Sequence, residues 1–146
     1  MKNKIFIKRI LILISITAIL ALSLLLFPND KVILKISDIR LQIEVADTGE
    51  ERVKGLSDRE SLGYRDGMLF IFDNESLHGI WMKDMNFAID ILWIDEGYKV
   101  VDIKKDAKPE SYPEVFIPEV PSKYVLEVNA GFLEENDIEI GDKIIF

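Results

Sequence analysis

The sequence contains no cysteine and only one histidine among its 146 residues. The lack of cysteine excludes disulfide bonds, a thiolate nucleophile and a cysteine-bound metal, and it excludes a lipoprotein anchored through an acylated cysteine. A single histidine excludes a mechanism that uses two imidazole groups. Stability therefore has to come from packing, and any chemistry has to come from carboxylates, amines or hydroxyls.

Recognisable catalytic and ligand-binding motifs are missing too. The chain has no glycine-rich phosphate loop, no HExxH zinc motif, no EF-hand loop and no GxSxG nucleophile motif. We therefore expect no cofactor and no resident metal. Whether the protein is an enzyme stays open at this point, but the sequence favours a binding function over catalysis.

Basic residues are scarce beyond the N-terminus. The first 28 residues hold four of the 18 basic residues and no acidic one, so Asn29 to Phe146 carry 14 basic against 26 acidic residues, a formal charge of −12. Such a surface repels the phosphates of nucleic acids and anionic lipid head groups. We expect no nucleic-acid partner.

One long apolar run is present, and it lies near the N-terminus. Ile10 to Phe27 are 18 residues without a charge, which is about the minimum for a helix that crosses a ~30 Å hydrocarbon layer. The basic residues before it predict a cytoplasmic N-terminus. We predict that residues 1–28 are a short cytoplasmic stretch and a transmembrane anchor, and that residues 29–146 form an extracytoplasmic domain of a single-pass protein in the cell membrane. Cleavage after Ser23 is the alternative, which would leave an apolar new terminus.

The remainder of the chain is patterned mainly as short strands. Two short helices are expected, one opened by a capping box between Thr48 and Glu51 and ending near Leu56, the other capped by Asn129. A proline-rich irregular loop is expected at residues 104–122. The predicted strands are 32–36, 39–45, 68–72, 87–94, 99–103, 124–128 and 143–146. This pattern predicts a mainly-β fold, a single compact β-sandwich or barrel-like domain with two short helices.

The segment HGIWMKDM, residues 78–85, gathers soft donor atoms. It holds the one histidine, one of the two tryptophans and two of the four methionines. Cu(I) favours imidazole and thioether ligands, so His78, Met82 and Met85 form a candidate site for a copper carrier. The neighbouring residues favour a strand or loop, and on a strand His78 and Met82 share one face while Met85 points to the other. We therefore predict no tight copper binding.

Two carboxylates interrupt strands that are otherwise apolar, Asp90 in the run 87–94 and Glu127 in the run 124–128. A buried carboxylate needs a partner or stays protonated, and the candidate cations are Lys83, Arg52 and Arg59. We predict that Asp90 is buried and paired with Lys83 or Arg59. A structural ion pair is the simplest interpretation. The functional interpretations are a hydrolase or lyase using Asp90, Glu127 and Lys83, or a pocket that recognises anions and carboxylates.

Polar and aromatic side chains from these segments define a candidate binding pocket. Its aromatic part could stack on a sugar or a peptide. The function favoured by the sequence is a membrane-anchored extracytoplasmic module that binds a protein, a peptide or a sugar, and that contacts the membrane through residues 10–27. The candidate pocket residues are Arg59, Trp81, Lys83, Asp90, Glu127 and Asn129.

Six blocks that follow one another along the chain resemble an uncharacterised prokaryotic family, domain of unknown function family 192. The blocks are VADTGEERVKGLSDRESL (45–62), GMLFIF (67–72), WMKDM (81–85), DILWID (90–95), YVLEVNAG (124–131) and IEIGDKI (138–144). The resemblance implies a mainly-β, sandwich-like domain, often behind a signal or anchor, and implies no reaction.

This chain departs from the pattern of that family at several positions. Ser57 stands where the pattern has methionine, Asp84 and Met85 stand where it has asparagine and threonine, and Ala88 replaces a proline. The Pro-Pro-Cys segment of the family is Lys-Pro-Glu here, at residues 108–110. A function that needed that cysteine is therefore excluded for this chain.

Overall fold

The computed structural model describes residues 32–36 and 38–145. The predicted anchor, within residues 1–28, lies outside this described part. None of the helices in the described residues is long and apolar enough to span a membrane. The elements of the described part are β1 (Val32–Ile36), β2 (Ile39–Ala46), α2 (Gly49–Lys54), β3 (Asp66–Ser76), β4 (Ile80–Trp81), β5 (Ile89–Ile94), β6 (Val100–Ala107), η1 (Pro109–Ser111), β7 (Val115–Phe116), β8 (Ser122–Asn129), α3 (Phe132–Glu135) and β9 (Ile144–Ile145).

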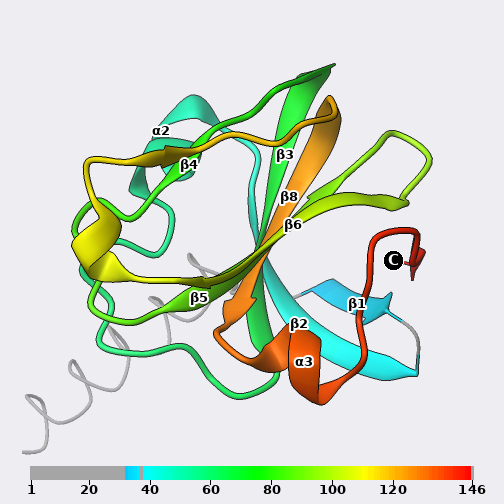
Figure 1. Cartoon of the computed structure of the whole chain (residues 1–146), viewed down its shortest axis with the longest axis horizontal. Coiled ribbons are helices and arrows are strands. Elements are labelled where there is room, and N and C mark those ends of the chain that lie inside the picture. The colour runs from blue at the N-terminus through cyan, green and yellow to red at the C-terminus, as the bar shows by residue number, and fades with distance from the viewer. Residues whose placement is uncertain (1–31, 37, 146) are drawn as a thin grey trace, which may run out of the picture. The chain divides into compact units, whose positions relative to one another are not determined.

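Seven of these strands form one curled sheet in the order β6-β5-β8-β3-β2-β1-β9 (Figure 1). All neighbours are antiparallel except β2 and β3, which run parallel. A parallel pair needs a crossover connection, and here the connection carries α2. The two remaining strands, β4 and β7, form a separate ribbon. The mainly-β class and the two short helices are confirmed, and the sheet has the shape of a half-barrel.

Both faces of this sheet are covered, because apolar residues occupy alternating and also successive positions along its central strands. The predicted central position of residues 68–72 is confirmed, since β3 is the fourth of seven strands. One core cluster includes Leu69, Leu92 and Leu126 from the sheet together with Phe132 and Leu133 of α3. This first face is therefore closed by α3 and the C-terminal segment.

The second face carries its own cluster. Phe70, Ile91 and Trp93 of the sheet pack there with Leu56, just after α2, and Ile80 of β4. Figure 1 shows α2 and the β4–β7 ribbon together at one side of the sheet, with α3 at another. The candidate functional site lies on this second face.

Two local expectations are wrong. Residues 104–122 are not loop throughout, because β6 continues to Ala107, β7 pairs with β4, and β8 begins at Ser122. The helix α3 is not capped by Asn129. It begins after Gly131, whose φ of 87° places it in the left-handed region that favours glycine.

Candidate functional site

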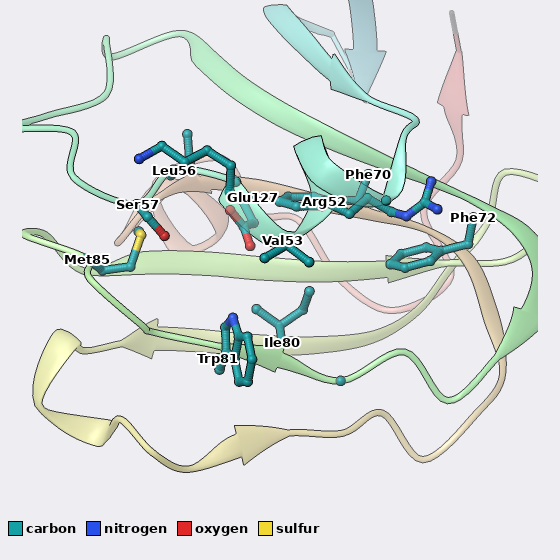
Figure 2. A pocket seen from close by; sticks show the side chains of 14 residues that line it. Arg52, Val53, Leu56, Ser57, Phe70, Phe72, Ile80, Trp81, Met85 and Glu127 are labelled. Atoms are coloured by element: carbon teal, nitrogen blue, oxygen red, sulfur yellow. The ribbon is translucent and has the colours of Figure 1, made fainter.

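A cavity of about 290 Å³ opens on the second face of the sheet, between α2 and β4 (Figure 2). Aromatic and aliphatic side chains make up most of its wall, and Glu127 of β8 reaches it from the sheet. The lining residues are Gly49, Arg52, Val53, Lys54, Gly55, Leu56, Ser57, Phe70, Phe72, Gly79, Ile80, Trp81, Met85 and Glu127.

The sequence around α2 explains why one wall of the cavity has its position. The predicted capping box is confirmed, because the Glu51 amide donates to the Thr48 hydroxyl at 3.2 Å and the Thr48 amide donates to the Glu51 carboxylate at 3.0 Å. The helix ends at Gly55, which has a φ of 47°. A Cβ atom at Gly55 would lie 3.2 Å from Cζ of Phe70. Glycine therefore lets the end of α2 approach the aromatic wall closely.

Arg52 connects this helix to the sheet. Its Nη1 donates to the carbonyl of Asp47 and, at 2.7 Å, to the carbonyl of Ile71. The guanidinium group lies over the ring of Phe72, 5.3 Å from its centroid. Among the described residues Arg52 forms no ion pair with a carboxylate. The cavity wall therefore carries a positive charge that is held in place by backbone carbonyls.

Glu127 lies in the cavity, and no described residue forms a hydrogen bond or an ion pair with its carboxyl group. Only 5% of the residue is exposed. Burial raises the pKa of Glu127 to about 8, although the positive charge of Arg59 opposes the rise. The carboxyl group is therefore mostly protonated at neutral pH. In Figure 2 it is directed into the space between α2 and β4.

The sheet register explains this position. Glu127 pairs with Met68 of β3 on one side and with Ile91 of β5 on the other, and both of these residues belong to the second core cluster. Side chains directly opposite on neighbouring strands lie on the same face. Glu127 thus lies in a row with the buried apolar side chains of Met68 and Ile91, and its carboxyl group faces the cavity.

Asp90 has a different environment, and the prediction that it pairs with Lys83 or Arg59 is wrong. It is buried, as expected, with 1% exposure. Its Oδ1 accepts from the amide of Asp106 at 2.9 Å, and its Oδ2 accepts from the amide of Leu133 at 3.0 Å. Charge-assisted bonds to backbone amides satisfy a carboxylate without a cation. Asp90 therefore ties β6 and α3 to β5.

The model of the DUF192 family, whose description is uncharacterized ACR, matches residues 32–146. The chain belongs to the DUF192 family. The UPF0127 protein PF1050 of Pyrococcus furiosus is 30% identical over 112 residues, which are 73% of this chain and 88% of that protein. No function is stated in either name.

Two solved structures resemble this DUF192 domain at 28% sequence identity. One is a protein of unknown function from Novosphingobium aromaticivorans, with a TM-score of 0.75, coverage of 80% of this chain and 85% of that chain. The other is described as a candidate transcription regulator from Sinorhizobium meliloti 1021, with a TM-score of 0.72 and coverage of 77% and 89%. These structures support the half-barrel fold of the DUF192 domain.

The candidate residues predicted from the sequence do not form one site in this DUF192 domain. Trp81 and Glu127 line the cavity, whereas the other four do not. Arg59 binds both carboxylate oxygens of Glu44, each at 2.8 Å, and the hydrogen bond to Glu44 raises the pKa of Arg59. Asn129 donates to the carbonyls of Leu62 and Gly63.

Lys83 and Asp90 are also separated from Glu127. Lys83 is exposed, with its ammonium group 6.0 Å from the centroid of the Trp81 ring. Asp90 pairs with Val128, while Glu127 pairs with the next residue along β5, Ile91. Successive side chains of a strand point to opposite faces, so the two carboxyl groups lie on different faces of the sheet and do not form an acid–base pair.

The histidine and methionine cluster is also arranged differently from the expectation. Within residues 78–85, only Ile80 and Trp81 belong to a strand, and the chain then turns at Asp84, which has a φ of 55°. Met82 is buried in the second core cluster and Met85 packs against the same cluster, so the expected opposite orientation of Met85 is wrong.

His78 stacks on Phe72 with ring centroids 3.6 Å apart, and its Nε2 lies 2.9 Å from the carbonyl oxygen of Asn74. In the described part of the chain, no three His, Cys, Asp or Glu side chains are grouped so that they could hold a metal ion.

Several lining residues were missed at the sequence level. Phe70 and Phe72 are two residues apart, which places them on one face of a strand, and this spacing was a usable signal. Arg52 was considered only as a counter-ion for a buried carboxylate. Ser57 and Met85, two departures from the family pattern, both line the cavity.

Proposed function

We propose that this DUF192 domain is a binding module that accommodates a ligand in the cavity between α2 and β4. The observation that carries the proposal is Glu127, a carboxyl group that is nearly fully buried in the cavity and has no partner among the described residues. The carboxyl group has no partner in the described part of the chain and lies at the cavity, so it can form a hydrogen bond with a ligand that brings a complementary polar group.

The wall of the cavity supports the same function. Ligand pockets are concave and mostly apolar, with a few polar groups that orient the ligand, and they start at about 300 Å³. The cavity is of this size, and its wall includes Phe70, Phe72 and Trp81. A small molecule or one side chain of a peptide would occupy it. Trp81 and Val53, which are 45% and 68% exposed, would contact the part of the ligand nearest the solvent.

We further propose that the N-terminal segment anchors this module in the cell membrane, with residues 29–146 on the extracytoplasmic side. The apolar run 10–27 and the basic residues before it support this location. The protein from Sinorhizobium meliloti is described in terms of transcription. The formal net charge of −8 of the present chain disfavours binding to DNA, so we propose no nucleic-acid partner.

A hydrolase or lyase is less well supported. The three residues proposed for such chemistry are Asp90, Glu127 and Lys83. Asp90 and Glu127 point to opposite faces of the sheet, and both oxygens of Asp90 already accept hydrogen bonds from backbone amides. We therefore favour binding over catalysis.

The proposal is tested with the full-length chain and a library of small aromatic and aliphatic compounds, using tryptophan fluorescence and thermal shift. Binding compounds are expected to lose affinity in Ser57→Phe, which adds a ring inside the cavity, and to keep it in Glu139→Gln on the surface. A library without binders, or binders that Ser57→Phe does not affect, would refute a ligand site in this cavity.

A further inference from the structure

We propose that the cavity binds an organic acid, a carboxylate carried on an apolar or aromatic group, with the carboxyl group of Glu127 as hydrogen-bond donor and Arg52 as a positive charge in the cavity wall. This inference rests on the binding function proposed above and names the class of its ligand. It follows from the charges of the lining, from the state of Glu127 and from the apolar wall.

The charges of the lining residues favour an anion. In the described part of the chain, two lining residues are basic, Arg52 and Lys54, and one is acidic, Glu127. Lys54 forms an ion pair with Asp58. Arg52 has no carboxylate partner among the described residues, and its two hydrogen bonds use Nη1 alone. In the described part of the chain, Nε and Nη2 of Arg52 make no hydrogen bond, so they can bind a ligand in a domain whose sequence is otherwise acidic.

Glu127 supplies a hydrogen bond of the matching kind. A protonated carboxyl group has one O–H donor, and a carboxylate can only accept. Burial keeps Glu127 in the protonated form at neutral pH, with a pKa of about 8. A ligand carboxylate would accept the O–H of Glu127. An ammonium ligand would instead require an ionised Glu127, which burial disfavours, in a cavity whose wall also carries Arg52 and Lys54.

Arg59 is the charged group that acts on Glu127, and further charged groups on this side of the sheet are engaged with other side chains. Arg59, in the loop after α2, is bound to Glu44 of β2. Lys104 of β6 lies over the ring of Phe116, 4.8 Å from its centroid. Lys83 follows β4 and lies near Trp81. All three of these groups are cations, so none of them would attract a cationic ligand into the cavity.

One further titratable group is close to the wall. The ring of His78 stacks on the ring of Phe72, which lines the cavity. A change in its protonation would alter the charge near the cavity without involving Glu127. The variant His78→Asn distinguishes the contributions of His78 and Glu127 to the pH dependence of affinity, because it removes the imidazole and leaves Glu127 in place.

The proposal predicts how affinity depends on pH. The ligand anion binds the protonated form of Glu127, so affinity is constant below the pKa of about 8 and decreases above it. The decrease is about tenfold for each pH unit above the pKa. An ammonium ligand would show the opposite dependence, with affinity increasing as Glu127 ionises. The sign of the pH dependence thus identifies the class of ligand.

Three probes of matched shape provide the test: phenylacetate, phenylacetamide and 2-phenylethylamine. Their binding to the full-length chain is measured by isothermal titration calorimetry near pH 7 and near pH 9. We expect phenylacetate to bind most tightly near pH 7 and to lose about tenfold in affinity near pH 9. Glu127→Gln should retain binding through its amide N–H but lose the pH dependence. Arg52→Gln should weaken phenylacetate more than phenylacetamide, and His78→Asn should leave the pH dependence unchanged.

The possible results separate the two proposals. Tighter binding of 2-phenylethylamine, or affinity for phenylacetate that does not change with pH, would overturn the organic-acid inference while the binding function stands. The organic-acid inference would also be overturned if other library compounds bind in the cavity and phenylacetate does not. If neither these probes nor any library compound binds, the binding function fails together with its ligand class.

Discussion

Asp90 and Glu127 lie on the neighbouring strands β5 and β8, one residue out of register, and their side chains point to opposite faces of the sheet. Both are almost fully buried. Asp90 accepts hydrogen bonds from two backbone amides, whereas Glu127 has no partner among the described residues and lines a cavity. The same type of side chain therefore has a structural role on one face and a proposed binding role on the other.

Asp90→Ala should destabilise the domain. The change leaves the buried amide of Leu133 and the part-buried amide of Asp106 without an acceptor, and the loss of an acceptor for a buried amide costs about 1–3 kcal/mol. We expect the free energy of unfolding in a denaturant titration to fall by roughly 2–5 kcal/mol. Asp73→Asn, a change at an exposed position, serves as control. Equal midpoints for Asp90→Ala and the parent would show that these two hydrogen bonds do not stabilise the fold.

Glu127→Gln should change how stability depends on pH. Between the ordinary value of 4.5 and the folded pKa of about 8, the folded chain keeps a proton that the unfolded chain has lost. The free energy of unfolding therefore falls as pH rises through this window, by at most about 1.4 kcal/mol per pH unit, and levels off above it. Glutamine cannot ionise, so the advantage of the variant over the parent should grow from pH 5 to pH 8. Parallel curves for the two proteins would contradict a buried, protonated Glu127.

Gly55→Ala should destabilise the end of α2 and narrow the cavity. The φ of 47° is unfavourable for alanine, and the added Cβ would lie 3.2 Å from the ring of Phe70. We expect a loss of about 1 kcal/mol or more in thermal or denaturant unfolding. Gly49→Ala is the matched control, because no atom lies within 4 Å of its added Cβ. The same effect for both variants would argue against this account of Gly55.

The N-terminal segment should remain attached and hold the protein in the membrane. No cleavage site follows the apolar run 10–27, and cleavage within it would expose an apolar terminus. Membrane fractionation and intact-mass measurement on the expressed full-length chain check this expectation. A soluble species that starts near Leu24 would contradict it.

Tight Cu(I) binding is not expected. Met82 is buried in the core, and Nε2 of His78 lies within hydrogen-bond distance of the Asn74 carbonyl, so neither donor is ready to bind a metal without rearrangement. Titration of Cu(I) against a competing chelator is the measurement. Sub-micromolar 1:1 binding that disappears in His78→Ala would show that these residues do converge on a copper ion.

Local structure was largely predictable from the sequence, because it depends on short-range rules. The strands at 32–36 and 39–45, the β5–β6 hairpin and the capping box of Thr48 and Glu51 follow from alternation and capping chemistry. The helix near residue 130 was expected, but its cap was misassigned. A glycine in the left-handed region took the place that Asn129 was expected to have.

The candidate site was predictable only in part. The sequence alone determined a mainly-β family fold, an acidic chain, the exclusion of cysteine chemistry, and two carboxyl groups placed in apolar strands. The tertiary structure decided the environment of those two groups. Side chains alternate between the two faces along β5 and β8, and this alternation places the two carboxyl groups on opposite faces. Elements distant in sequence then supply Asp90 with two backbone amides and place the side chains of α2 and β4 around the cavity that Glu127 lines. Hydrogen-bond partners and burial depend on contacts between segments far apart in the chain, which short-range patterns do not encode.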